Sequence, residues 1–107
     1  MDPRAGKNAS DSDAAPGSSE PRRFTYEEKV LRAFLCDGRL VSIPTQQRKR
    51  LVVLRELCDR CFTEDRAYPE KEVNQRLALF HRDVAALRRD MVDHGLLTRA
   101  AGEYRRA

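Results

Sequence analysis

The sequence predicts a mostly α fold of the α+β class, a winged helix-turn-helix with a small C-terminal β-hairpin. Two segments with helical periodicity, residues 69–79 and 83–94, are joined by a short polar turn. Such a pair of short helices is typical of a helix-turn-helix. Two β-prone runs follow within residues 96–106 and flank a glycine-containing loop, which is the pattern of a β-hairpin, here the wing.

The first of the two helices is predicted over residues 69–79. Pro69 suits the first turn of a helix, and Glu70 and Glu72 place carboxylates at the positive end of the helix dipole. Apolar side chains then recur at helical spacing, at Val73, Leu77 and Phe80.

The second helix, over residues 83–94, is predicted to be the recognition helix. Asp83 is a suitable N-cap, because its short carboxylate can accept hydrogen bonds from the free amides of the first turn. Gly95 ends the helix, since glycine tolerates the left-handed backbone that closes many helices. The apolar stripe consists of Val84, Leu87 and Met91.

A further helix is predicted over residues 25–36. Thr25 and Glu28 have the spacing of a capping box. The apolar face of this helix is wide, because Leu31 and Leu35 lie well round the helix from Val30. This width suggests a homodimer that forms through helix 25–36.

The middle of the chain contributes one strand and one helix. Residues 39–43 alternate apolar and polar, which predicts a strand that Pro44 ends. We expect this strand to extend the sheet of the C-terminal hairpin. A helix follows over residues 45–61, and residues 67–68 are predicted as a short edge strand.

Residues 1–23 are predicted to be a disordered tail, and residues 24–107 to be a single winged-helix-like domain. The tail is rich in Ser, Asp, Ala, Gly and Pro, and such a composition buries too little apolar surface to offset the entropy of ordering. The whole chain has 107 residues, which leaves no room for a separate catalytic domain.

The basic residues are concentrated in the region of the predicted helix-turn-helix. The formal net charge is +4, and residues 45–107 carry fourteen basic and ten acidic side chains. This excess permits a polyanionic partner. No stretch of the chain is apolar for the eighteen or more residues of a membrane span, so we expect no membrane partner and a cytoplasmic protein.

One face of the predicted recognition helix is suited to entering the major groove of DNA. Opposite its apolar stripe lie Arg82, Ala85, Ala86, Arg89 and Asp93. The alanines allow close approach, and Arg82 and Arg89 can reach phosphates or the O6/N7 edge of guanine. These two arginines are therefore the candidates for direct contact. The alternative is an ordinary solvated helix face.

Three further arginines are predicted to support DNA binding. Arg88 lies near the apolar boundary of the recognition helix, where we expect it to pair with a carboxylate such as Glu72. Arg99 and Arg105 lie on the hairpin and can reach the adjacent backbone or a minor groove. Solubilising charge at the end of the chain is the alternative for this pair.

No catalytic, metal or cofactor site is expected. Cys58 and Cys61 have metal-ligand spacing, but they fall on the buried face of a predicted helix and no second ligand pair follows. His81 lies in the inter-helix turn, where it is expected to close a hydrogen bond. The sequence contains no phosphate-binding loop and no nucleophile motif, so we expect the protein not to be an enzyme.

Residues 35–106 resemble a bacterial domain of unknown function. The resemblance rests on the segments DGRLVSIPTQQRKRLVVLRELCDRCF, YPEKEVNQRL and FHRDVAALRRDMVDHGLLTR, which occur in that order. It implies a winged-helix-like fold and an association with transcriptional regulators, and it carries no catalytic residues. The motif positions are Tyr68, Glu70, Glu72, Val73, Asn74, His81, Asp83, Leu87, Arg88 and Arg89.

The function predicted from these observations is DNA binding by a transcriptional regulator whose partner is double-stranded DNA. The alternative is a winged helix that binds another protein, through the face containing Ala85 and Ala86 or through helix 25–36. The two differ in their response to salt, because binding to phosphates weakens steeply as salt is added.

Overall fold

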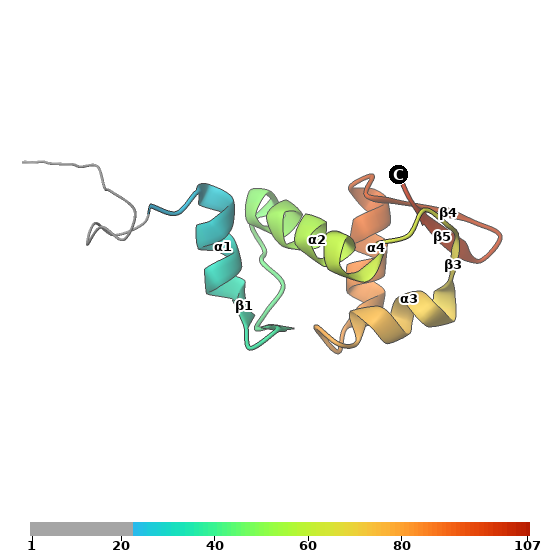
Figure 1. Ribbon diagram of the computed structural model, residues 1–107, viewed down its shortest axis with the longest axis horizontal. Coiled ribbons are helices and arrows are strands. Elements are labelled where there is room, and N and C mark those ends of the chain that lie inside the picture. Colours follow the sequence, from blue (N-terminus) through green and yellow to red (C-terminus); the bar gives the residue numbers. More distant parts are fainter. Residues whose placement is uncertain (1–22) are drawn as a thin grey trace, which may run out of the picture.

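A computed structural model describes residues 23–107 of the chain (Figure 1). The predicted disordered tail, residues 1–23, lies outside the described residues except for Arg23. The elements, in chain order, are α1 (Tyr26–Phe34), β1 (Leu35–Cys36), β2 (Arg39–Leu40), α2 (Gln47–Cys61), β3 (Tyr68–Pro69), α3 (Glu70–Leu77), α4 (Val84–Asp93), β4 (Leu97–Ala100) and β5 (Glu103–Arg106).

The part of the chain from α2 to β5 has the topology of a winged helix-turn-helix. Helix α2 is followed by the single strand β3, the helix pair α3 and α4, and the hairpin of β4 and β5. Strand β5 lies in the centre of an antiparallel three-stranded sheet, between β3 and β4. The predicted α+β fold class is therefore confirmed.

Helix α1 begins where it was predicted and ends earlier. The Thr25 hydroxyl accepts from the backbone amide of Glu28, and the Glu28 carboxylate accepts from the amide of Thr25, which completes the capping box. The helix was predicted to reach residue 36, but it stops at Phe34 because residues 35–36 form strand β1. Its partly buried apolar side chains, Tyr26, Leu31 and Phe34, pack against the core.

The predicted strand over residues 39–43 is wrong in its length and in its partner. Strand β2 contains only Arg39 and Leu40, and it pairs with β1 in a separate two-stranded sheet. The cause is the turn at Asp37 and Gly38, which both have a positive φ. An Asp-Gly pair with this backbone closes a two-residue hairpin, so the strand folds back on its immediate neighbour.

The small β1–β2 hairpin contacts the turn between α3 and α4. The amide of Leu40 donates to the carbonyl of Phe80 at 2.8 Å. The Arg39 guanidinium donates to the carbonyl of Leu79 at 3.0 Å. Figure 1 shows this hairpin beside the loop that leads from α3 into α4. The β1–β2 hairpin, which precedes α3 and α4 in sequence, thus helps to hold the turn where α4 begins.

Helix α2 forms the centre of the core. Its buried side chains face α1 on one side and α3 and α4 on the other. They are Val53, Leu54, Leu57, Cys58 and Cys61. The C-terminal end of α2 is capped by two arginines from distant elements. Arg106 donates to the carbonyls of Cys58 and Phe62, and Arg76 donates to that of Cys61. They satisfy the carbonyls of Cys61 and Phe62 at the helix end, and they add a second hydrogen bond to the Cys58 carbonyl, which also accepts from the amide of Phe62.

The turn between α3 and α4 is shaped by its own side chains. Helix α3 ends at Leu77, two residues before the predicted end at 79. Asp83 caps α4 through a hydrogen bond from the amide of Ala86 to its carboxylate. The ring of His81 accepts from the amide of Asp83 at 3.0 Å, which confirms that His81 closes a hydrogen bond in the turn.

The burial of α2 predicts a large difference in reactivity among the three cysteines. Burial raises the pKa of the Cys58 thiol to about 12 and that of Cys61 to about 11, whereas Cys36 is exposed. Because a raised pKa leaves almost no thiolate at pH 8, Cys58 and Cys61 are expected to resist a thiol-specific reagent. A disulfide reagent should therefore modify one thiol rapidly in the folded protein and all three in denaturant.

The control for this experiment is the Cys36→Ser variant, in which no thiol of the folded protein should react rapidly. Reaction of the two remaining thiols should increase only as the pH approaches 11 or the chain unfolds. Three rapidly reacting thiols in the folded wild-type protein at pH 8 would show that the end of α2 is open to solvent.

Candidate nucleic-acid interface

The carboxylate of Glu70 connects α3, α4 and the wing. Its Oε1 atom accepts a hydrogen bond from the Tyr104 hydroxyl of β5 at 2.9 Å. The same oxygen lies 3.9 Å from Nε of Arg88 on α4 and 3.8 Å from Nη2 of Arg99 on β4. The backbone of Glu70 also takes part, since its amide donates to the carbonyl of Gly102 in the wing turn.

Arg88 is fixed from two sides and is therefore a positioning residue. It donates from Nη1 to the side-chain oxygen of Asn74 on α3 and lies close to Glu70. The prediction that Arg88 pairs with Glu72 is wrong. Glu70 and Asn74 are four residues apart on α3, so both lie on the face that packs against α4. Glu72 lies on another face of the helix.

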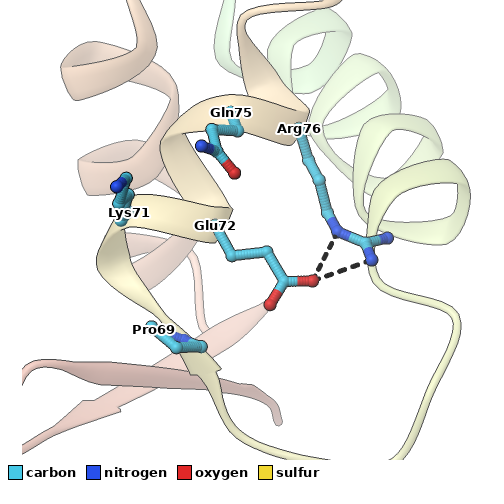
Figure 2. Close-up of a pocket in the computed structure, with 5 residues that line it drawn as sticks. All are labelled: Pro69, Lys71, Glu72, Gln75 and Arg76. Atoms are coloured by element: carbon cyan, nitrogen blue, oxygen red, sulfur yellow. Dashed lines mark hydrogen bonds and ion pairs between the residues drawn. The ribbon is translucent and has the colours of Figure 1, made fainter.

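Glu72 instead holds α3 against the loop that follows α2. Its carboxylate accepts from Nη2 of Arg66 at 2.7 Å and from Nε of Arg76 at 2.9 Å. Figure 2 shows the Glu72 and Arg76 side chains turned toward each other beside α2. Hydrogen bonds from Arg66, and then from Arg76, lower the pKa of Glu72 despite the opposing effect of desolvation. Arg66 also stacks over the buried ring of Tyr68, with 3.9 Å from Cζ to the ring centroid.

The shallow hollow drawn in Figure 2 offers few free groups for a ligand. It has a volume of about 500 Å³. It is lined by Pro69, Lys71, Glu72, Gln75 and Arg76. Its acid and its arginine are already paired with each other, and its remaining polar side chains, Lys71 and Gln75, are exposed on the surface of α3. The charged pair of this hollow, Glu72 and Arg76, therefore serves mainly to hold α3 in place.

A second groove lies between α4 and the wing and contains three of the five predicted site residues. Its volume is about 270 Å³. The lining residues are Ala85, Arg88, Arg89, Val92, Asp93, Arg99 and Tyr104. Three guanidinium groups from two elements thus meet at one surface hollow. An arginine-rich hollow of this kind suits an anion such as phosphate.

Two predicted site residues have no partner within the part of the chain that the structure describes. Arg82, in the turn, and Arg89, on α4, are both exposed. The side chain of neither residue forms a hydrogen bond, an ion pair or a ring contact with another residue among 23–107, whereas the Arg82 carbonyl accepts from the amide of Val84. The other motif arginine, Arg88, is bound by α3. Arg82 and Arg89 therefore keep all their donors available for an external partner.

The two arginines of the wing lie on opposite faces of the hairpin. Arg99 is directly across from Tyr104, and Thr98 is directly across from Arg105. Because side chains alternate along a strand, Arg99 faces α4 with Tyr104 and Arg105 points to the other side. There Arg105 donates to Asp65 at 3.2 Å. The structure thus brings Arg88, Arg89 and Arg99 together and leaves Arg105 outside the groove.

The acidic side chains of α4 are divided between the interior and the groove. Asp90 lies 3.9 Å from Arg50 of α2 and is turned away from the exposed face. Asp93 is exposed and lines the C-terminal end of the groove. Of the positive side chains without a partner, Arg82 therefore precedes α4 and Arg89 lies at its middle, whereas the exposed carboxylate of Asp93 is at its C-terminal end.

Among residues 23–107, no group of three or more His, Cys, Asp or Glu side chains could hold a metal ion. In the same range, no helix is both long and apolar enough to span a membrane.

Sequence reasoning missed Glu70 and Tyr104 as members of the site. The sequence analysis explained Glu70 by the helix dipole. The alternation of side chains along the wing strand is the signal that could have placed Tyr104 on the face toward the helices.

Comparison with known proteins gives one family. Residues 39–106 match the family model described as "Uncharacterized protein conserved in bacteria (DUF2087)". The match covers well over half of the chain and contains the elements from β2 to the wing. No curated protein and no solved structure matches the chain. The resemblance to a bacterial domain of unknown function is thereby confirmed.

The hydrogen bond between Tyr104 and Glu70 predicts a measurable loss of stability when it is removed. Burial, followed by this bond, raises the pKa of the Tyr104 hydroxyl, so the hydroxyl remains a donor at neutral pH. Tyr104→Phe should lower the free energy of unfolding by about 1 kcal/mol, measured by urea denaturation.

Tyr26→Phe is the matched control, because the Tyr26 ring is partly buried and stacks under Arg48. Its hydroxyl makes no hydrogen bond among the described residues. Equal stability changes in the two variants would show that the Glu70 contact contributes nothing.

Proposed function

This chain belongs to the bacterial DUF2087 family, and from its geometry we propose that it binds double-stranded DNA through α4 and the wing. The observation that carries the proposal is the unpartnered side chain of Arg89, which lines a groove with Arg99 of the wing, together with the unpartnered Arg82 in the turn before α4. In a fold where most arginines bind carboxylates or carbonyls, free guanidinium groups on one face point to a partner outside the chain.

The exposed face of α4 has the shape needed to approach the major groove. Ala85 and Arg89 are four residues apart on α4, so they lie along one side of the helix, and Arg82 is in the turn that precedes it. All three are exposed. The small Ala85 lets the helix backbone come close to DNA, and the flanking arginines can reach phosphates or guanine edges.

The wing supplies the second contact. Arg99 is about three-fifths exposed, with a side-chain exposure of 59%, and its guanidinium lies over the Tyr104 ring. The wing turn consists of Ala101 and Gly102, whose small side chains allow the backbone of the turn to approach a phosphate. Arg88 acts through its position between Asn74 and Glu70, and Arg105 contributes at most to the general charge.

The acidic side chains of α4 determine which end of the helix faces the DNA. Asp90 is turned toward Arg50, but Asp93 would face a phosphate directly. The N-terminal end of α4 is therefore the end that enters the groove, with Arg82 in the preceding turn and Arg89 at the middle of the helix. On this basis the protein acts as a transcriptional regulator in the bacterial cytoplasm, without catalysis and without a cofactor.

A protein-binding module is the second candidate, because two large apolar side chains are exposed close together. Val41 is 65% exposed and Leu79 is 68% exposed. They lie on segments joined by the hydrogen bond from Arg39 to the Leu79 carbonyl. Association through this surface would change little with salt, whereas DNA binding weakens steeply. The homodimer through residues 25–36 stays a prediction.

The test of the proposed function is the affinity for a labelled duplex of random sequence, measured by fluorescence anisotropy at several salt concentrations. Arg89→Ala should raise the Kd about tenfold and reduce the salt slope by about one. Arg55→Ala is the control, since Arg55 is an exposed arginine on α2 that lines a hollow with Glu27 and Leu31 of α1 and does not line the groove beside the wing.

The control matters because every arginine lost reduces the net charge equally. An equal loss of affinity in the two variants would mean that binding follows net charge and has no specific surface. Absence of binding by the folded wild-type protein at low salt would contradict the proposed function and favour the protein-binding surface.

A further inference from the structure

We infer that the groove between α4 and the wing seats a single phosphate group of the DNA backbone, held between Arg89 and Arg99. The inference rests on the proposed function for the identity of the partner. It goes further in assigning one phosphate to one defined hollow and in naming the residues that hold it. The size of the hollow, its free donors and its fixed walls support the assignment.

The size suits a small group. Pockets for drug-sized ligands have volumes of about 300–1,000 Å³, and this groove has about 270 Å³. Its walls alternate between apolar and cationic groups, with Ala85 and Val92 between the arginines. A phosphate that accepts hydrogen bonds from the arginines needs no polar group from Ala85 or Val92.

The three arginines keep most of their donors. A guanidinium has five N–H donors, and Arg89 uses none of them within the described chain. The distances from Glu70 to Arg99 and Arg88 are 3.8 and 3.9 Å. These are ion pairs longer than a hydrogen bond. Of the three arginines, only Arg88 forms a side-chain hydrogen bond, to Asn74.

The position of Arg99 is set before any ligand binds. Its guanidinium lies over the ring of Tyr104, with 5.8 Å from its Cζ to the ring centroid. The Tyr104 hydroxyl in turn donates to Glu70. Holding the guanidinium of Arg99 in place lowers the entropy lost when an anion binds.

The carboxylates limit the charge of the occupant. Asp93 lines one end of the groove, and Glu70 lies behind Arg88 and Arg99. Two carboxylates opposite three guanidinium groups leave a modest positive excess. This balance fits a phosphodiester, which carries one negative charge, better than a cluster of phosphates.

Binding of a phosphate in the groove between α4 and the wing is tested first with inorganic phosphate as the probe. Amide ¹H–¹⁵N spectra of the full chain are recorded during a phosphate titration, with sodium chloride keeping the ionic strength constant. We expect saturable shifts at residues 85–93 and 99–104. Arg99→Ala and Arg89→Ala should each weaken phosphate binding about tenfold, as expected for a charge-assisted contact.

Arg105→Ala is the matched control, because Arg105 is on the same hairpin and has a side-chain exposure of 52%, close to that of Arg99. It faces the opposite side and should leave phosphate binding unchanged. Shifts that do not saturate, or that weaken equally in Arg99→Ala and Arg105→Ala, would overturn the seat.

A second titration, with the random-sequence duplex already bound, identifies the source of the phosphate. Loss of the phosphate-induced shifts supports a backbone phosphate as the occupant. Persistence of these shifts on the duplex-bound protein overturns that assignment and points to a free phosphorylated compound.

The two proposals can fail separately. Duplex binding that is weakened by Arg89→Ala, without any saturable phosphate shift, would remove the seat and keep the proposed function. Saturable phosphate binding by a protein that does not bind the duplex would remove the proposed function and with it the backbone occupant.

Discussion

The carboxylate of Glu70 is the contact on which the arrangement of the candidate interface depends. It lies in the first turn of α3, where the helix dipole favours a negative charge. From there it accepts from Tyr104 of β5 and lies close to Arg88 of α4 and Arg99 of β4. Helix α4 and the wing are therefore positioned relative to each other through a third element. Without the carboxylate at position 70, Arg88 would keep only its hydrogen bond to Asn74, and Arg99 only its contact with the Tyr104 ring.

Most arginines in the described part of this domain stabilise the fold, so their abundance alone says little about DNA. Arg76 and Arg106 cap the carbonyls at the end of α2. Arg66 lies over the ring of Tyr68 and donates to the Glu72 carboxylate. The guanidinium N–H groups of these arginines donate to carbonyls and carboxylates of the chain itself. The informative arginines are Arg82, in the turn before α4, and Arg89, on its exposed face, because their side chains have no such partner.

Local signals in the sequence predicted the helix pair and the hairpin well. The Asp83 cap and the spacing of Leu87 and Met91 are properties of a few neighbouring residues, and the structure contains α4 within one residue of the predicted bounds. The strand over residues 39–43 failed for a similar local reason. The turn at Asp37 and Gly38 outweighed the alternating pattern, and it paired β2 with β1.

The composition of the site could not be obtained in the same way. Which carboxylate binds Arg88 depends on the rotation of α3 against α4, and the sequence does not reveal that rotation. The opposite placement of Arg99 and Arg105 follows from a register that only the pairing of β4 with β5 fixes. Glu70 and Tyr104 are 34 residues apart, so their contact is a product of the tertiary fold.

The most direct test of the interface is an amide ¹H–¹⁵N map of the full chain during titration with duplex DNA. The largest perturbations should fall on residues 82–89 and 97–104, with α1 unaffected, because α4 and the wing form one surface. Perturbations confined to α1, or to the β1–β2 hairpin and Leu79, would contradict that surface as the site of DNA binding.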